Sequence, residues 1–127
     1  EYRSQSESTL QFFGEIIEEE MANVGRTRGV SFDLGPAMPT APAKTDPALV
    51  DLLAVQCEKA GIRYERLPSG AGHDAAVFAN AGIPTAMVFV RNEHGSHNPH
   101  EAMDMDDFFM GAEVLYKALM SAPEALP

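Results

Sequence analysis

The sequence predicts an α/β fold built around a sheet of the parallel type, and three observations support this prediction. Segments with helical patterning alternate with short apolar segments of strand length along the 127 residues. One short segment, "PTAMVFV" (84–90), is almost continuously apolar, which is typical of a strand buried on both faces. Two polar, glycine-containing loops directly follow predicted strands, where ligand-binding loops lie in such sheets.

The first helix is predicted over residues 6–25, after a short strand that Tyr2 and its neighbours would close. Ser6 or Ser8 is the expected N-cap and Gly25 the expected end. The helical spacing comes from apolar residues at Leu10, Phe13, Ile16, Ile17 and Met21. The next segment, "GVSFDLG" (29–35), alternates apolar and other residues, as a half-buried strand does.

A proline-rich stretch, "GPAMPTAPAKTDP" (35–47), separates these elements from the rest and is predicted to be an interdomain linker. Asp46 and Pro47 then begin a helix over residues 47–60, which is expected to stop at Gly61.

The remaining chain continues the alternation of strands and helices. A short strand "RYERLP" (63–68) and the loop "SGAG" precede a helix over residues 73–82. The apolar strand 84–90 follows, then the loop "EHGSHNPHE" (93–101), and a last helix is expected from about residue 104 to 120.

Composition disfavours some classes of function. Nine basic and nineteen acidic residues give a net charge of −10, and no cluster of Lys and Arg suits a nucleic-acid partner. The longest apolar run is far shorter than the roughly 20 residues that cross a membrane. The single cysteine, Cys57, cannot form an internal disulfide, is expected to be a buried structural thiol, and fits a cytoplasmic protein.

The loop "EHGSHNPHE" places His94, His97 and His100 three residues apart. Gly95 and Pro99 prevent the helix that would put the three imidazoles on one face, so a three-histidine metal site is disfavoured. Two interpretations stay open. His97 is one ligand of a metal site completed by residues elsewhere, or it is an ordinary polar loop residue.

Four further residues are candidates for a functional or a plain structural role. Glu101 could orient His97 from behind, or complement the start of the last helix. Asp74 opens the helix after "SGAG", and His73 could cap that helix or face a substrate. Arg3 is either a surface arginine or a clamp for a substrate carboxylate.

Three segments together carry a family resemblance: "YRSQSEST" (2–9), "LPSGAGHDAAVFANAGIPTAMVFV" (67–90) and "GSHNPHEAMDMDDFFMGAEVLYKAL" (95–119). They resemble the C-terminal part of the amidase, hydantoinase and carbamoylase group of aminoacylase-like dinuclear metallohydrolases. That group includes N-carbamoyl-L-amino acid hydrolases, allantoate amidohydrolases and β-ureidopropionases. The resemblance covers nearly the whole chain in order, and "SGAGHDA" together with "SHNPHE" is quite specific.

The resemblance implies a more detailed architecture. Residues 1–36 would be the last strand-helix-strand of a ferredoxin-like lid and dimerisation domain. Residues 37–127 would be the C-terminal part of an αβα catalytic domain. The chain begins "EYRSQSEST" without an initiator methionine, so it is expected to be a piece of a longer, dimeric polypeptide.

The resemblance also implies roles for individual residues. His97 would bind one of two divalent metal ions, zinc or else manganese, nickel or cobalt. Arg3 would grip the substrate carboxylate, Gly72 would contact substrate through its backbone, and His73 would lie on the substrate side. Asp74 and Glu101 would orient these groups.

Two departures from the family pattern matter. "EYRS" replaces the usual "DIRS" motif, and the other metal ligands and the general-base glutamate have no counterpart in this chain. The expected substrate is a carbamoyl or ureido amino acid, but the chain alone is expected to bind Zn²⁺ weakly and to lack activity. The alternatives are a non-catalytic dimerisation or binding module and an aminoacylase or dipeptidase.

Overall fold

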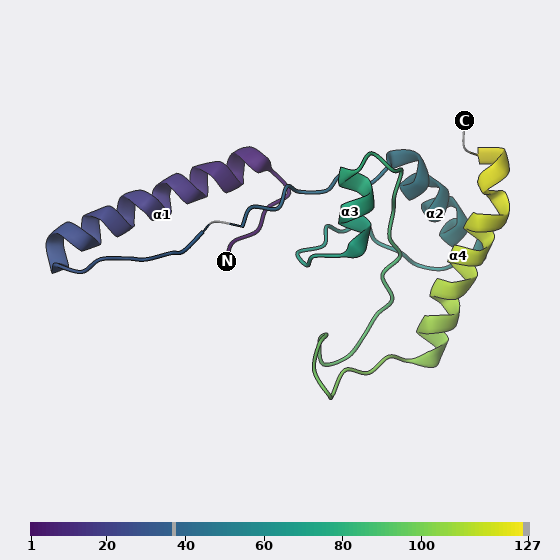
Figure 1. Ribbon diagram of the computed structural model, residues 1–127. Coiled ribbons are helices and arrows are strands. Elements are labelled where there is room, and N and C mark those ends of the chain that lie inside the picture. The colour runs from purple at the N-terminus through teal and green to yellow at the C-terminus, as the bar shows by residue number, and fades with distance from the viewer. Residues whose placement is uncertain (37, 126–127) are drawn as a thin grey trace.

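The structure, a computed structural model, describes residues 1–36 and 38–125, with side chains described as far as Ser121. Four helices account for most of the regular structure (Figure 1): α1 (Glu7–Arg28), α2 (Pro47–Ala60), α3 (Asp74–Asn80) and α4 (Met105–Ala125). The four predicted helices are therefore confirmed, with shifted ends in three of them. None of these helices is both long and apolar enough to span a bilayer.

The predicted strands are not confirmed in the part of the chain that the structure describes. Segments 29–35, 63–68 and 84–90 lie between helices and have no sheet partner among the described residues, where the one β-bridge joins Glu93 to Ala102. An apolar pattern sets which side chains a strand would bury, but pairing requires a neighbouring backbone that offers its N–H and C=O groups. Within 1–36 and 38–125, no ladder of such bonds pairs these segments; segment 84–90 receives a single backbone bond, from the Asp46 amide.

Helix α1 begins as predicted and ends one turn later than predicted. The side chain of Ser6 accepts a hydrogen bond from the Thr9 amide at 3.3 Å, which satisfies a free donor of the first turn. The helix passes through Gly25 and stops at Gly29, whose φ of 67° is left-handed and whose amide donates to the Gly25 carbonyl. Gly29, not Gly25, has the conformation that only glycine adopts without strain.

Helix α2 matches its prediction at both ends. The Asp46 carboxylate accepts from the Leu49 amide at 3.0 Å, Pro47 opens the helix, and Gly61 ends it with φ 67°. The linker before it is held to the apolar segment 84–90, since the Asp46 amide donates to the Thr85 carbonyl at 2.8 Å.

Helices α2 and α4 pack on one another and contain the small core of the molecule. The core side chains are Ala54, Val114 and Ala118, whose small size allows the two helices to approach closely. One buried polar group lies with them, because Gln56 is 4% exposed and donates to the Ser121 hydroxyl at 3.1 Å. That bond satisfies an amide that would otherwise destabilise the contact.

The single cysteine lies in the same region. Cys57 is a half-buried free thiol, and burial raises its pKa above the ordinary value. A thiol with a raised pKa forms little thiolate near neutral pH, which agrees with the predicted structural role.

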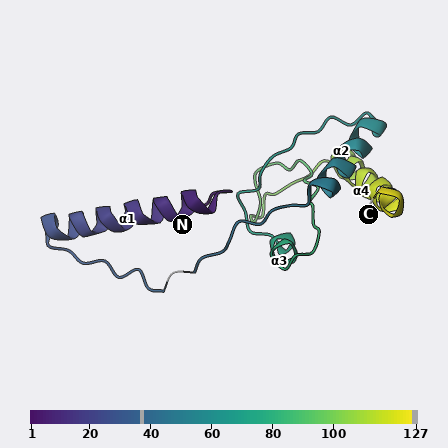
Figure 2. The ribbon, with the colours of Figure 1, turned by 90° about the horizontal axis from the view of Figure 1, so that it is seen from above.

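Helix α1 lies apart from this packed pair, and the segment after it runs back along it (Figures 1 and 2). No residue of α1 is buried. The N-terminal segment folds onto the helix, since the Tyr2 ring lies 5.6 Å from the Phe13 ring and its hydroxyl covers Gly14. The proposed division of the chain at residue 36 stays a prediction.

Candidate functional site

The loop before α3 is held together by a serine and a histidine. The Ser69 hydroxyl lies 2.6 Å from Nε2 of His73 and also accepts from the Ala71 amide at 3.1 Å. His73 occupies the N-cap position of α3, but its side chain makes no capping hydrogen bond. Its imidazole instead packs against Phe89, with ring centroids 5.6 Å apart. The capping interpretation of His73 is therefore wrong, and the ring is available for other contacts.

Arg3, which lies near the N-terminus, also contacts this loop. Its Nη1 donates to the Gly70 carbonyl and its Nε donates to a carboxylate oxygen of Glu1 at 2.9 Å, while Nη2 forms an ion pair with the same oxygen at 2.7 Å. One open cleft is lined by Arg3, Gly72 and His73 together with Tyr2 and Phe89. The structure thus places Arg3 in contact with the loop that contains the other two residues predicted to bind substrate, Gly72 and His73.

Asp74 directly follows His73 in the sequence, but its carboxylate acts on helix α3. It is exposed in the first turn of α3, where a carboxylate complements the partial positive charge of the free amides. Its orienting role stays a prediction.

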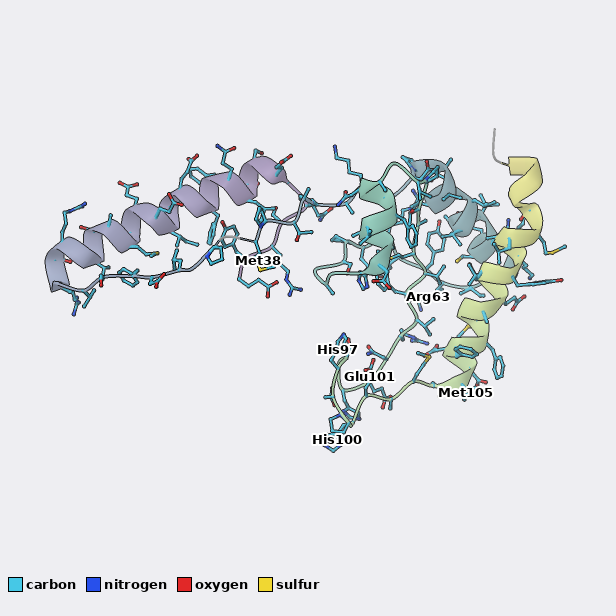
Figure 3. All side chains as sticks on the ribbon, in the orientation of Figure 1. Met38, Arg63, His97, His100, Glu101 and Met105 are labelled. Carbon is cyan, nitrogen blue, oxygen red and sulfur yellow. The ribbon has the colours of Figure 1, made fainter. Side chains whose placement is uncertain are left out.

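The second histidine-bearing loop is organised by Glu101. One oxygen of this carboxylate accepts from the His97 amide at 3.1 Å, and the other accepts from the Asn92 side chain at 2.9 Å. The bridge between Glu93 and Ala102 closes the base of the loop, with N···O distances of 2.7 and 3.2 Å. Glu101 therefore contacts His97 through the backbone and leaves the imidazole free (Figure 3).

The helix-start interpretation of Glu101 does not fit the geometry. Helix α4 begins at Met105, four residues later, and Asp104 supplies the local cap by accepting from the Asp106 amide at 2.8 Å. The carboxylate of Glu101 is used inside the loop instead.

The three histidines of this loop do not converge on one point. His100 lies at the far end of the loop from His97 (Figure 3). Among the described residues, no group of three or more His, Cys, Asp or Glu side chains is arranged to hold a metal ion. A single exposed imidazole on a backbone fixed by Glu101 fits the donor chemistry of one ligand to zinc, manganese, nickel or cobalt. The geometry of this loop fits the contribution of one metal ligand and not of several.

The two loops lie apart in Figure 1, and His97 does not line the cleft that contains Arg3. The sequence predicted that both loops would meet at one edge of a sheet. Without paired strands in the described residues, nothing aligns the ends of segments 63–68 and 84–90 at such an edge.

Two residues that hold the loops were missed from the sequence. Ser69 fixes the imidazole of His73, and Asn92 shares the Glu101 carboxylate with His97. Ser69 precedes His73 by four residues across two glycines, a spacing that could have indicated a closed polar turn. Asn92 is nine residues from Glu101, and no local pattern indicates that pair.

Comparison with known proteins identifies the family. The model of the peptidase family M20/M25/M40 matches residues 4–121. The chain belongs to this family. It is 36% identical over 107 residues to the N-carbamoyl-L-amino-acid amidohydrolase of Pseudomonas sp. (strain NS671), covering 84% of this chain and 26% of that protein.

Two other relatives agree with this assignment. The allantoate amidohydrolase of Escherichia coli (strain K12) is 32% identical over 109 residues, covering 85% of this chain and 26% of that protein. An uncharacterized hydrolase of Haemophilus influenzae is 35% identical over 111 residues, covering 87% and 27%. The chain thus spans about a quarter of the length of the curated relatives it matches.

Proposed function

We propose that this chain is the C-terminal part of a divalent-metal-dependent amidohydrolase that cleaves C–N bonds of N-carbamoyl amino acids or allantoate-like ureido compounds. Family membership and the names of the relatives support the reaction class. The observation that carries the proposal is the contact of Arg3 with the loop that contains Gly72 and His73. It puts a carboxylate-binding group beside a loop whose backbone is open to approach at Gly72.

Arg3 is the proposed anchor for the substrate carboxylate. Its Nε and Nη2 already hold the carboxylate of Glu1, and its Nη1 is fixed on the Gly70 carbonyl. A planar guanidinium binds carboxylates through this kind of edge. Glu1 is exposed, so a substrate carboxylate could replace it with little loss of stability.

Gly72 and His73 are the proposed contacts to the rest of the substrate. No atom lies within 4 Å of the position where a Cβ on Gly72 would stand, so a ligand can approach the backbone there. The imidazole of His73 lines the same cleft.

His97 is the proposed ligand for one of two divalent metal ions, and Glu101 holds its backbone. When bound, such ions supply Lewis-acid polarisation of the scissile carbonyl. Arg3 orients the substrate through its carboxylate, and Tyr2 and Phe89 add apolar surface to the lining of the cleft. The remaining ligands and the general base would belong to other parts of a longer, cytoplasmic homodimer.

A second candidate is a non-catalytic dimerisation or binding module. It is favoured by α1, which buries no residue and exposes large apolar side chains such as Phe12 at 62%. The following segment exposes Leu34 at 69%. A surface of this kind is typical of a protein interface.

The test compares this chain with the full-length polypeptide that its gene encodes. With Zn²⁺, Mn²⁺, Ni²⁺ or Co²⁺ supplied, the full-length protein should hydrolyse N-carbamoyl amino acids or allantoate, and this chain should not. Hydrolysis by this chain alone would contradict its assignment as a partial enzyme. A full-length protein that cleaves dipeptides and no ureido compound would replace the proposal with a peptidase, and one without hydrolase activity would favour the binding module.

A further inference from the structure

The Ser69 hydroxyl has one proton and two possible acceptors for it. Nε2 of His73 lies at 2.6 Å, and the Ala71 carbonyl lies at 3.5 Å. A contact at 3.5 Å is at the limit of hydrogen bonding and one at 2.6 Å is well within it, so we assign the Ser69 proton to the contact with Nε2. The Ala71 amide donates to the same oxygen at 3.1 Å and holds the hydroxyl in place.

This assignment decides where the proton of His73 resides. A neutral imidazole carries one proton, and the nitrogen that accepts a hydrogen bond is the one without it. With Nε2 assigned as the acceptor from Ser69, the proton of the neutral ring resides on Nδ1. The second nitrogen therefore offers an N–H donor.

The ring is also fixed in orientation. His73 is half-buried, its backbone is extended with φ −137° and ψ 152°, and its side chain takes no part in capping α3. Phe89 packs against it at 5.6 Å with the two rings tilted by 57°. One nitrogen is thus held by Ser69 and one face by Phe89, so the imidazole cannot turn without losing both contacts.

We propose that Ser69 is a positioning residue that fixes His73 as its Nδ1–H tautomer, so that the imidazole donates to an acceptor oxygen of a ligand in the cleft shared with Arg3. Resting on the proposed function, the inference names that acceptor as the carbonyl or carboxylate oxygen of a carbamoyl or ureido substrate. Arg3 and His73 then both present donors, and the cleft selects for a ligand rich in acceptor oxygens.

The first test measures the tautomer in this chain. Long-range ¹H–¹⁵N correlation spectra, taken above the pH at which the imidazole becomes neutral, distinguish a protonated Nδ1 from a protonated Nε2. The expected result is Nδ1–H for His73 in the unmodified chain, a change toward Nε2–H in Ser69→Ala, and recovery in Ser69→Thr. Amide signals of Ala54 and Val114 report that the α2–α4 core is intact in each variant. A protonated Nε2 in the unmodified chain, or the same tautomer in Ser69→Ala, would overturn the inference.

The second test uses the full-length enzyme. Ser69→Ala should raise KM for a carbamoyl amino acid about tenfold, the loss expected for one misdirected hydrogen bond, and should change kcat less. Ser69→Thr should restore KM to within about twofold, because it keeps the hydroxyl. An unchanged KM in Ser69→Ala would contradict the positioning role. If the full-length protein hydrolyses no ureido compound, the proposed function fails, and the tautomer measurement alone decides the inference about Ser69.

Discussion

The loops 69–73 and 93–101 are both polar, contain glycine and carry a histidine, but different atoms of the histidine are held. In the first loop, Ser69 holds the imidazole of His73. In the second, Glu101 holds the backbone amide of His97 and leaves its imidazole exposed. A ring with one fixed nitrogen suits an oriented hydrogen bond to a ligand. A free ring on a fixed backbone suits a metal ion, whose own bond then orients the ring.

The two loops also differ in backbone conformation. In the second loop, His94, Gly95 and His97 have φ of 64°, 72° and 63°, in the left-handed region that residues with a Cβ rarely adopt. Gly70 and Gly72 of the first loop have no such φ. Strained residues of this kind persist where neighbouring contacts hold them, and such contacts here come from Glu101 and Asn98.

The largest effect is expected from removing the imidazole of His97 in the full-length enzyme. His97→Asn deletes the metal-binding ring, while asparagine tolerates the left-handed backbone. Metal affinity should fall by more than about 100-fold, beyond what loss of an outer contact causes. Elemental analysis and metal titration measure this. His94→Asn is the matched control, because His94 has nearly the same φ and is also exposed. Equal metal content in both variants would remove His97 from the metal site.

The next effect is expected from Glu101, the residue that holds the backbone of His97. Glu101→Ala removes the acceptors for both the His97 amide and the Asn92 side chain. Metal affinity should fall by roughly 10–100-fold, as it does when groups that support a ligand are lost. Glu101→Gln keeps one carbonyl oxygen as an acceptor, so its metal affinity should lie between that of the unmodified enzyme and that of Glu101→Ala. Glu93→Gln is the control, because its carboxylate is 3.9 Å from the His94 ring and makes no closer contact to the loop. A Glu101→Ala enzyme with full metal affinity would show that the backbone bond does not support the ligand.

The helices could be predicted from the sequence because their signals are local. Both ends of α2 are determined by neighbouring residues: Asp46 and Pro47 at its start and Gly61 at its end. The prediction failed at the end of α1, where Gly25 and Gly29 were both acceptable stops and only the backbone conformation distinguishes them. The strand patterns in 29–35, 63–68 and 84–90 fixed no pairing, since a strand depends on a partner distant in sequence.

The sequence indicated only part of the candidate site, because contacts between residues distant in sequence leave no local pattern. Residue type and the family resemblance selected Arg3, His73, His97 and Glu101. The contact between Arg3 and Gly70 spans 67 positions, and no pattern in one sequence reports it. Ser69 was overlooked because a serine beside glycines reads as a simple turn residue.

A smaller effect is expected from Arg3, which ties the first loop to the N-terminal segment. Arg3→Ala should raise KM for a carbamoyl amino acid about tenfold and leave kcat nearly unchanged, because the lost charge-assisted bond serves binding. Steady-state kinetics of the full-length enzyme measure both. Glu1→Gln is the control, since it weakens only an exposed ion pair and should change KM by less than about twofold. Equal KM values for Arg3→Ala and the unmodified enzyme would exclude Arg3 from substrate binding.

The smallest effect is expected from replacing one glycine in each of the two loops and comparing the loss of stability. Gly95 has φ 72° and no atom within 4 Å of the place that a Cβ would occupy, so Gly95→Ala should destabilise the second loop by about 1 kcal/mol through backbone strain alone. Gly72 has equal space and no left-handed φ, so Gly72→Ala should change stability by less than about 0.5 kcal/mol. Amide hydrogen exchange in each loop and thermal unfolding measure the difference. Gly72→Ala should still raise KM, because its methyl group would stand where the substrate approaches the backbone. Should Gly72→Ala destabilise its loop as much as Gly95→Ala does, the glycine would serve folding, and its proposed role toward substrate would lose its support.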